Sequence, residues 1–187
     1  MKPHLFPRQF RVALLFSVIS TLCLAAGPTD SPSLLQGGDF QKCAENSKGP
    51  PGWDSNGRVV KEPGKPQNLV MQITGPDEMG FDCPLNLPAA VHSLRVSFRI
   101  LVPLGMKFDP EVEVKGVRLR VRLYHKGGSS GVKERIIPPA EGWQQIHFDW
   151  DDIGSFRGRL GIEALWQADS IYFDDVQVSD RSTDTMK

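Results

Sequence analysis

The sequence predicts an all-β protein, an antiparallel β-sandwich, on three observations. Apolar and polar residues alternate over 68–74, 93–101 and 117–124, which is the period of half-buried strands. Turn signals rich in Gly and Pro separate these stretches. No stretch of about 11 residues or more repeats its apolar residues with helical spacing. Six to eight short strands between turns are typical of a sandwich.

The expected strands follow one another along the chain. In 68–74, Leu69, Met71 and Ile73 share one side, and the stretches 93–101 and 117–124 each place four apolar residues in the same way. Three further strands are expected near the C-terminus: 142–148, 160–166 and 170–178. Two stretches are expected to be loops because Gly, Pro and polar residues dominate them: 41–65 and 126–133.

The first 26 residues resemble a cleaved signal peptide. A basic start is followed by the apolar run 12–24 and by two small residues, Ala25 and Ala26. The run is shorter than the roughly 20 apolar residues that span a bilayer. We therefore expect a protein that is secreted, periplasmic or at the cell surface, with no membrane span after cleavage. Its parts are a signal peptide (1–26), a tether (27–33), a β-sandwich domain (34–179) and a polar tail (180–187).

Charge and cysteine content agree with export. Without residues 1–26 the chain has 161 residues, with 19 basic and 22 acidic side chains, a net charge of about −3. This balance argues against a dedicated nucleic-acid binder, which would show a strong basic excess. Cys43 and Cys83 then form one even pair, which predicts a disulfide in an oxidising compartment. A two-cysteine metal or redox site is the alternative, although the spacing fits no zinc pattern.

Several motifs occur in a recognisable order. They begin with Leu34–Phe40 and the pair Gly52-Trp53, and they continue with the strand stretches 94–100, 142–148 and 171–178. Together these motifs resemble the galactose-binding-domain-like jelly rolls. That group includes many non-catalytic carbohydrate-binding modules of secreted bacterial glycosidases. The resemblance implies a jelly-roll fold and a glycan partner, and it covers most of the chain after residue 26.

The resemblance also implies a structural calcium ion where the N-terminal strand meets the last one. The matching residues are Asp39, Asp174 and Asp175, whose carboxylates suit this hard cation. One departure weakens the site, because Gln41 stands where the group often has Glu. The alternative is that Asp39 ends a strand in a turn and that Asp174 and Asp175 lie at a β-bulge.

The stretch 117–124 also predicts a ligand surface. If its aliphatic residues face the core, Arg118, Arg120, Arg122 and Tyr124 all face outward. Arg95 and Arg99 would join them if 93–101 lay in the same sheet. Guanidinium groups bind carboxylates and sulfates bidentately, which favours an acidic polysaccharide as the ligand. The alternative is a solvated face whose arginines are neutralised by glutamates: Glu111, Glu113, Glu134 and Glu163.

Four tryptophans could supply flat faces for stacking on sugar rings. Trp53 and Trp143 occupy motif positions that are expected to be core. Trp150 and Trp166 have polar sequence neighbours, so these two are the candidates for contact with a ligand.

Nothing in the sequence forms a convincing catalytic set, so we expect binding rather than catalysis. There is no metal-binding histidine pair. The enzyme alternative is a jelly-roll polysaccharide lyase that uses Tyr124 or His125 with the arginines. The other alternative is a protein-interaction or architectural module of the cell envelope. Such a module should bury its aromatic residues and expose an apolar patch, whereas a glycan binder should expose an aromatic ring in a polar groove.

Overall fold

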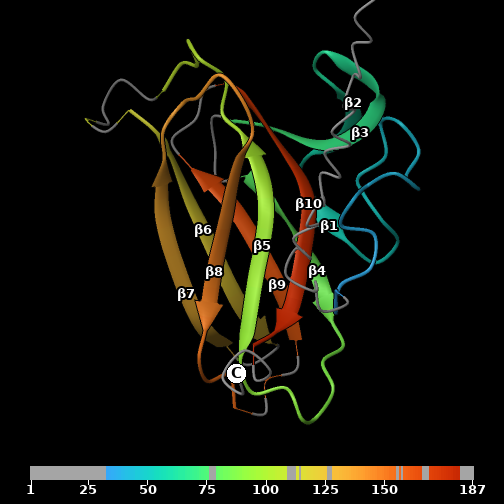
Figure 1. Ribbon diagram of the computed structural model, residues 1–187, viewed down its shortest axis with the longest axis vertical. Coiled ribbons are helices and arrows are strands. Elements are labelled where there is room, and N and C mark those ends of the chain that lie inside the picture. Colours follow the sequence, from blue (N-terminus) through green and yellow to red (C-terminus); the bar gives the residue numbers. More distant parts are fainter. Residues whose placement is uncertain are drawn as a thin grey trace, which may run out of the picture. The chain divides into compact units, whose positions relative to one another are not determined.

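The computed structural model describes ten strands arranged in two antiparallel sheets of five strands each, so the predicted all-β sandwich is confirmed (Figure 1). The structure describes residues 33–75, 79–108, 113, 115–125, 128–154, 156, 158–165 and 169–181. The predicted signal peptide, most of the tether, most of the tail and Trp166 lie outside these residues. Within the described residues, no helix is long and apolar enough to cross a membrane.

The first sheet carries the predicted arginine strand. Its strand order is β1 (Asp54–Ser55), β4 (Met79–Leu85), β9 (Gly158–Leu165), β6 (Val117–His125) and β7 (Gly128–Ile137). The second sheet has the order β2 (Arg58–Glu62), β3 (Lys65–Thr74), β10 (Ser170–Asp180), β5 (Leu94–Leu101) and β8 (Gln144–Trp150). Because β5 and β6 belong to different sheets, their outward residues lie on opposite faces of the sandwich.

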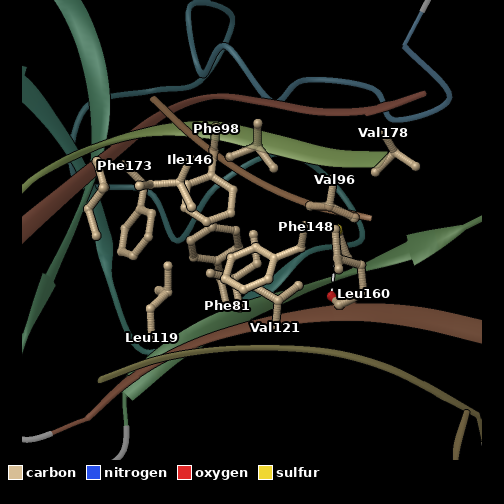
Figure 2. Packing of buried hydrophobic residues seen from close by; sticks show 14 of the residues in the cluster. Phe81, Val96, Phe98, Leu119, Val121, Ile146, Phe148, Leu160, Phe173 and Val178 are labelled. Atoms are coloured by element: carbon tan, nitrogen blue, oxygen red, sulfur yellow. Dashed lines mark hydrogen bonds between the residues drawn. The ribbon is translucent and has the colours of Figure 1, made fainter. Parts of the chain in front are cut away.

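The core fills the space between the two sheets, as Figure 2 shows. Phe98 of β5 stacks with Phe148 of β8 at a centroid distance of 6.3 Å. Phe81 of β4 meets Phe173 of β10 edge-on at 5.4 Å, which joins the two sheets. Each buried side chain of this size stabilises the fold by about 1.5–3 kcal/mol. The alternation seen in the sequence is therefore the pattern of one buried face per sheet.

The chain before β1 runs along β10. The Leu34 amide donates to the Val178 carbonyl at 2.6 Å, and the Val176 amide donates to the Gly38 carbonyl at 2.9 Å. Beside this contact, the pairing of β10 with β5 shifts register between Asp174 and Gln177. Asp175 there has a φ of 49°. The alternative expectation of a β-bulge at Asp174 and Asp175 is thus confirmed.

Four strands occur where the sequence showed no strand. Strands β1 and β2 lie inside the expected loop 41–65, and β7 begins inside the expected loop 126–133. Strand β4 is not among the expected strands. Its buried residues Phe81, Cys83 and Leu85 nevertheless alternate with more exposed residues. The other six strands agree with the expected stretches to within a few residues.

The predicted disulfide is wrong for this structure, because Cys43 and Cys83 are both free thiols. Cys83 is fully buried on β4, and its Sγ lies 3.7 Å from the carbonyl oxygen of Leu160 on the neighbouring strand. Burial raises the pKa of Cys83 to about 12. Burial and the charge of Asp39 also raise the pKa of Cys43. Both groups are therefore thiols rather than reactive thiolates near neutral pH.

Candidate functional site

The outward residues of β6 form a single row on the first sheet. The aliphatic residues of β6 are buried, whereas Arg118, Arg120, Arg122 and Tyr124 are partly exposed. This is the arrangement expected from the alternation. The condition that would have added Arg95 and Arg99 is not met, because β5 lies in the second sheet. This face therefore carries Arg118, Arg120 and Arg122, without Arg95 and Arg99.

Glutamates on the neighbouring strands pair with these arginines. Glu134 of β7 accepts from Arg118 Nη2 at 2.6 Å and from Arg120 Nε at 2.7 Å. Glu163 of β9 accepts from Arg120 Nη1 at 3.3 Å and forms an ion pair with Arg122. Hydrogen bonds from Arg120 and Arg118 lower the pKa of Glu134 below its ordinary value. Of the glutamates expected to neutralise the row, these two do so.

That expectation also named two other glutamates. Glu113 is exposed in a bend before β6, and Glu111 lies outside the described residues.

A polar hollow of about 190 Å³ opens on the same face, next to Tyr124. Its floor contains Gly80 of β4 and Gly161 of β9, which leave the face without side chains at those points. The register places Gly161 between Asp82 and Arg122. A Cβ at Gly161 would lie 3.2 Å from Tyr124 Cε1. The polar side chains that line the hollow come from four strands and one turn: Asp54, Ser55, Asn56, Asp82, Tyr124 and Glu163.

Tyr124 is held as a neutral phenol at the edge of this hollow. Burial first, and then its hydrogen bond to the Asp82 carboxylate, raises the pKa of Tyr124 to about 12, although Arg159 acts in the opposite direction. Arg159 of β9 in turn forms an ion pair with Asp82 of β4. The phenol, the carboxylate and the guanidinium therefore hold one another in fixed positions that offer donors and acceptors to a hydroxyl-rich ligand.

Sequence reasoning missed Asp82, Arg159 and the two glycines of the floor. A usable signal existed in glycines at outward strand positions, which often mark a close approach by a ligand or by another backbone. Gly80 and Gly161 occupy such positions on adjacent strands, but the pairing of β4 with β9 is visible only in the structure.

The tryptophans differ from expectation. Trp150 is 5% exposed and packs in the core between the sheets, so it is not available for stacking on a ligand. Trp166, the other candidate, lies outside the described residues. Trp53 packs against the core as expected and stacks on Phe81 at 5.4 Å. Trp143 was expected in the core but covers Arg99 on the outer face of the second sheet, with 5.1 Å between the guanidinium carbon and the ring centroid.

The three residues expected to hold calcium do not fit that ion. Oxygen Oδ2 of Asp174 already accepts from Arg99 at 2.6 Å and from Asn68 at 2.9 Å. Asp175 forms an ion pair with the same Arg99 at 2.7 Å. Asp39 lines a separate surface depression with Asp175. Calcium needs six to eight oxygen ligands, and within the described residues no group of three or more His, Cys, Asp or Glu side chains gathers around one point.

Solved structures of other proteins share this fold. No family model and no curated protein matches the chain. Among solved structures, it is similar to TmCBM61 in complex with β-1,4-galactotriose, with a TM-score of 0.55 and 17% identity over 80% of this chain and 99% of that one. The CBM22-1–CBM22-2 tandem domain of Paenibacillus barcinonensis Xyn10C gives a TM-score of 0.52 and 14% identity, over 83% of this chain and 52% of that one.

The chain has the jelly-roll fold of carbohydrate-binding modules. At these identities the likeness establishes the fold, as the motif order in the sequence implied. The same fold also occurs in the enzymatically active domain of bacteriophage CBA120 tailspike protein 4. That match has a TM-score of 0.57 and 8% identity, and it covers 79% of this chain but only 21% of the tailspike domain. The site, rather than the fold, therefore has to decide between binding and catalysis.

Proposed function

We propose that this protein is a non-catalytic glycan-binding module, and that it binds a neutral glycan over the polar hollow on the outer face of the first sheet. The observation that carries the proposal is the hollow itself: a glycine floor, the neutral phenol of Tyr124 at its edge, and the fixed pair of Asp82 and Arg159. Sugar hydroxyls both donate and accept, so they match fixed carboxylates and guanidinium groups. An aromatic edge supplies the apolar contact that a sugar ring also needs.

The size of the hollow suits one ring of a glycan chain. At about 190 Å³ it is smaller than the roughly 300–1,000 Å³ of pockets that enclose drug-sized ligands. The open sheet on either side allows the chain to continue beyond the bound ring. The galactotriose in the TmCBM61 structure, which shares the fold, is a neutral glycan of this kind.

The charge pairing favours a neutral ligand over the acidic polysaccharide expected from the arginine row. Arg118, Arg120 and Arg122 each contact Glu134 or Glu163. An anionic ligand would have to compete with these glutamates for the same guanidinium groups. A neutral glycan can instead bind to the ion pairs as they stand. Acidic glycans are the alternative ligand.

Tyr124 is poorly suited to the lyase alternative. A tyrosine that removes a proton must ionise near the working pH. A pKa of about 12 keeps Tyr124 protonated. An interaction module is also less favoured, because few large apolar side chains are exposed within the described residues: Leu104, and Val132 and Ile136, which Glu134 separates on the outer side of β7. Export, and a location outside the cell or at its surface, rest on the signal peptide expected at residues 1–26.

A glycan array of the full protein, followed by calorimetric titration, tests this proposal. We expect selective binding of neutral glycans, with β-1,4-galactotriose among the probes. Tyr124→Ala should weaken binding at least about tenfold, equivalent to about 1.4 kcal/mol. The matched control is Tyr172→Ala, because Tyr172 is partly exposed on β10 of the second sheet. It should bind as the parent does.

The variants also distinguish the alternatives. Binding confined to acidic glycans, and weakened by both Arg120→Ala and Arg122→Ala, would replace the neutral ligand with the acidic one on the same face. Equal losses in Tyr124→Ala and Tyr172→Ala would place the ligand elsewhere. An array with no bound glycan would remove the proposed function and leave the fold assignment intact.

A further inference from the structure

The junction between the N-terminal segment and β10 contains a buried carboxylate with a full set of protein partners. Asp174 is 1% exposed. Its Oδ1 accepts from the Asp175 amide at 2.8 Å, and its Oδ2 accepts from Arg99 Nη2 at 2.6 Å and Asn68 Nδ2 at 2.9 Å. A buried charge is tolerated only when it is paired and hydrogen-bonded. Asp174 meets this requirement with side chains of its own chain.

Arg99 provides the positive charge at this junction. Its Nη2 contacts Asp174, and its Nε lies 2.7 Å from Asp175 Oδ2. One guanidinium therefore joins the two carboxylates of the β-bulge. The ring of Trp143 covers the guanidinium, and the indole nitrogen of Trp143 donates to Glu62 at 2.8 Å. The position of Arg99 is thus fixed from both sides.

Gln41 completes the junction on the N-terminal side. Its amide nitrogen Nε2 lies among three carbonyl oxygens, at 2.7 Å from Asp39 O, 2.7 Å from Asn68 Oδ1 and 3.0 Å from Leu69 O. Oxygens gathered at such distances around one point form a site that either N–H donors or a cation can occupy. In this chain the amide of Gln41 supplies the donors.

Asn68 links the two halves of the network. Its Oδ1 accepts from Gln41, and its Nδ2 donates to Asp174 and to Glu62 Oε2 at 2.7 Å. Glu62 is 4% exposed and also lies 3.4 Å from Lys65 Nζ. The hydrogen bonds and ion pairs therefore run without a break from the N-terminal segment through β3 to β10 and β5.

We propose that Arg99 and the amide of Gln41 replace a structural metal ion at this junction, so that the folded protein is stable without calcium. Two of the three carboxylates expected to bind calcium, those of Asp174 and Asp175, are bound to Arg99, and three carbonyl oxygens of the junction are bound to Gln41. Exchange of the amide for a carboxylate removes the donors and leaves an oxygen-only cluster. Gln41→Glu is therefore the change that makes the junction require a cation.

Thermal unfolding of the full protein, with Ca²⁺ and with a chelator, tests this inference without reference to glycan binding. The Tm of the parent protein should be the same in both conditions. Gln41→Glu should lower the Tm in chelator by at least about 3 °C, and Ca²⁺ should recover most of that loss. The matched control is Gln36→Glu, the same change of charge on an exposed side chain of the same segment. Its Tm should not respond to Ca²⁺.

Arg99→Met tests the role of Arg99 at this junction. It should lower the Tm in both conditions, because it leaves Asp174 buried without its cation. A parent Tm that rises with Ca²⁺ and falls with chelator would overturn the inference. So would a Gln41→Glu variant that ignores Ca²⁺, or an Arg99→Met variant that keeps the parent Tm.

Discussion

At the scale of single residues, the candidate binding face depends on its glycines as much as on its side chains. Gly161 has strand geometry that an alanine can adopt, but a Cβ there would lie 3.2 Å from Tyr124 and 3.4 Å from Arg122 Cγ. The added methyl would press on these two side chains of the outer face rather than on the core. This glycine therefore leaves room for the Tyr124 ring and the Arg122 stem, which is a role that charge or hydropathy patterns do not reveal.

We expect Gly161→Ala to weaken glycan binding about tenfold while it changes the free energy of unfolding by less than about 1 kcal/mol. Titration calorimetry and thermal unfolding measure the two effects. Gly142→Ala is the matched control, since a Cβ at Gly142 would meet nothing within 4 Å. Undiminished binding by Gly161→Ala would mean that the ligand does not reach the floor of the hollow.

Residue patterns predicted only part of this face. The row from Arg118 to Tyr124 follows from alternation along a single strand, so the sequence was sufficient to predict it. Asp82 and Arg159 come from two other strands, and their contact with Tyr124 depends on cross-strand pairing. Its acidic neighbours make Trp150 a candidate for ligand contact, yet the strand alternation that places Ile146 and Phe148 inward also places Trp150 inward.

At the scale of elements, β7 shows why an edge strand can escape detection. Its positions that face the second sheet include Lys133 and Arg135 instead of apolar residues. Their cationic ends lie 5.6 Å and 5.2 Å from the ring centroids of Trp150 and Phe148. The aliphatic stems cover the open edge of the core, as long basic side chains commonly do. The sequence of β7 therefore reads as a polar loop although it forms a ten-residue strand.

The N-terminal segment is an element whose fit to β10 can be tested at Gly38. A Cβ on Gly38 would lie 1.8 Å from the Val176 carbonyl oxygen, so an alanine there has to push the segment off β10. We expect Gly38→Ala to lower the free energy of unfolding by about 2–3 kcal/mol, measured by denaturant titration.

Gly64→Ala is the control for this substitution. Gly64 has a φ of +80° with open space around its Cβ position, so its replacement adds backbone strain of about 1 kcal/mol and no clash. Equal losses in the two variants would mean that the segment is not held against β10.

At the scale of the whole molecule, the division of strands between sheets decides what shares a face. Strands β5 and β6 have the same alternation and the same arginine-rich outer positions, so their sequences cannot say whether they are neighbours. The structure separates them into two sheets. As a result Arg99 belongs to the junction with β10, and Arg120 belongs to the candidate binding face. One residue pattern thus serves two purposes, which only the long-range pairing distinguishes.

The ion pairs on the two faces together give the molecule a defined response to acid. In Glu134, hydrogen bonds from Arg120 and Arg118 lower the pKa. The hydrogen bond from Arg95 lowers the pKa of Asp149. Burial raises the pKa of Glu62, but the hydrogen bonds from Trp143 and Asn68 outweigh that effect, so its pKa is also lowered. A carboxyl whose pKa is lowered by folding stabilises the fold above its unfolded pKa and loses that contribution as the pH falls through its folded pKa.

We therefore expect the Tm to be nearly constant from neutral pH to about pH 5 and to fall progressively below the ordinary carboxyl values of 4.5 for Glu and 3.8 for Asp. Asp174 opposes this trend, because burial raises its pKa and protonation relieves the buried charge. Glu134→Gln should lower the Tm at neutral pH and make the acid decline shallower, whereas Glu141→Gln, an exposed change in the loop before β8, should leave the profile as it is. Calorimetry from pH 7 to pH 2 gives these curves. A Tm that rises as the pH falls below 4.5 would mean that the buried Asp174, and not the paired carboxylates on the two faces, dominates the electrostatic balance of the fold.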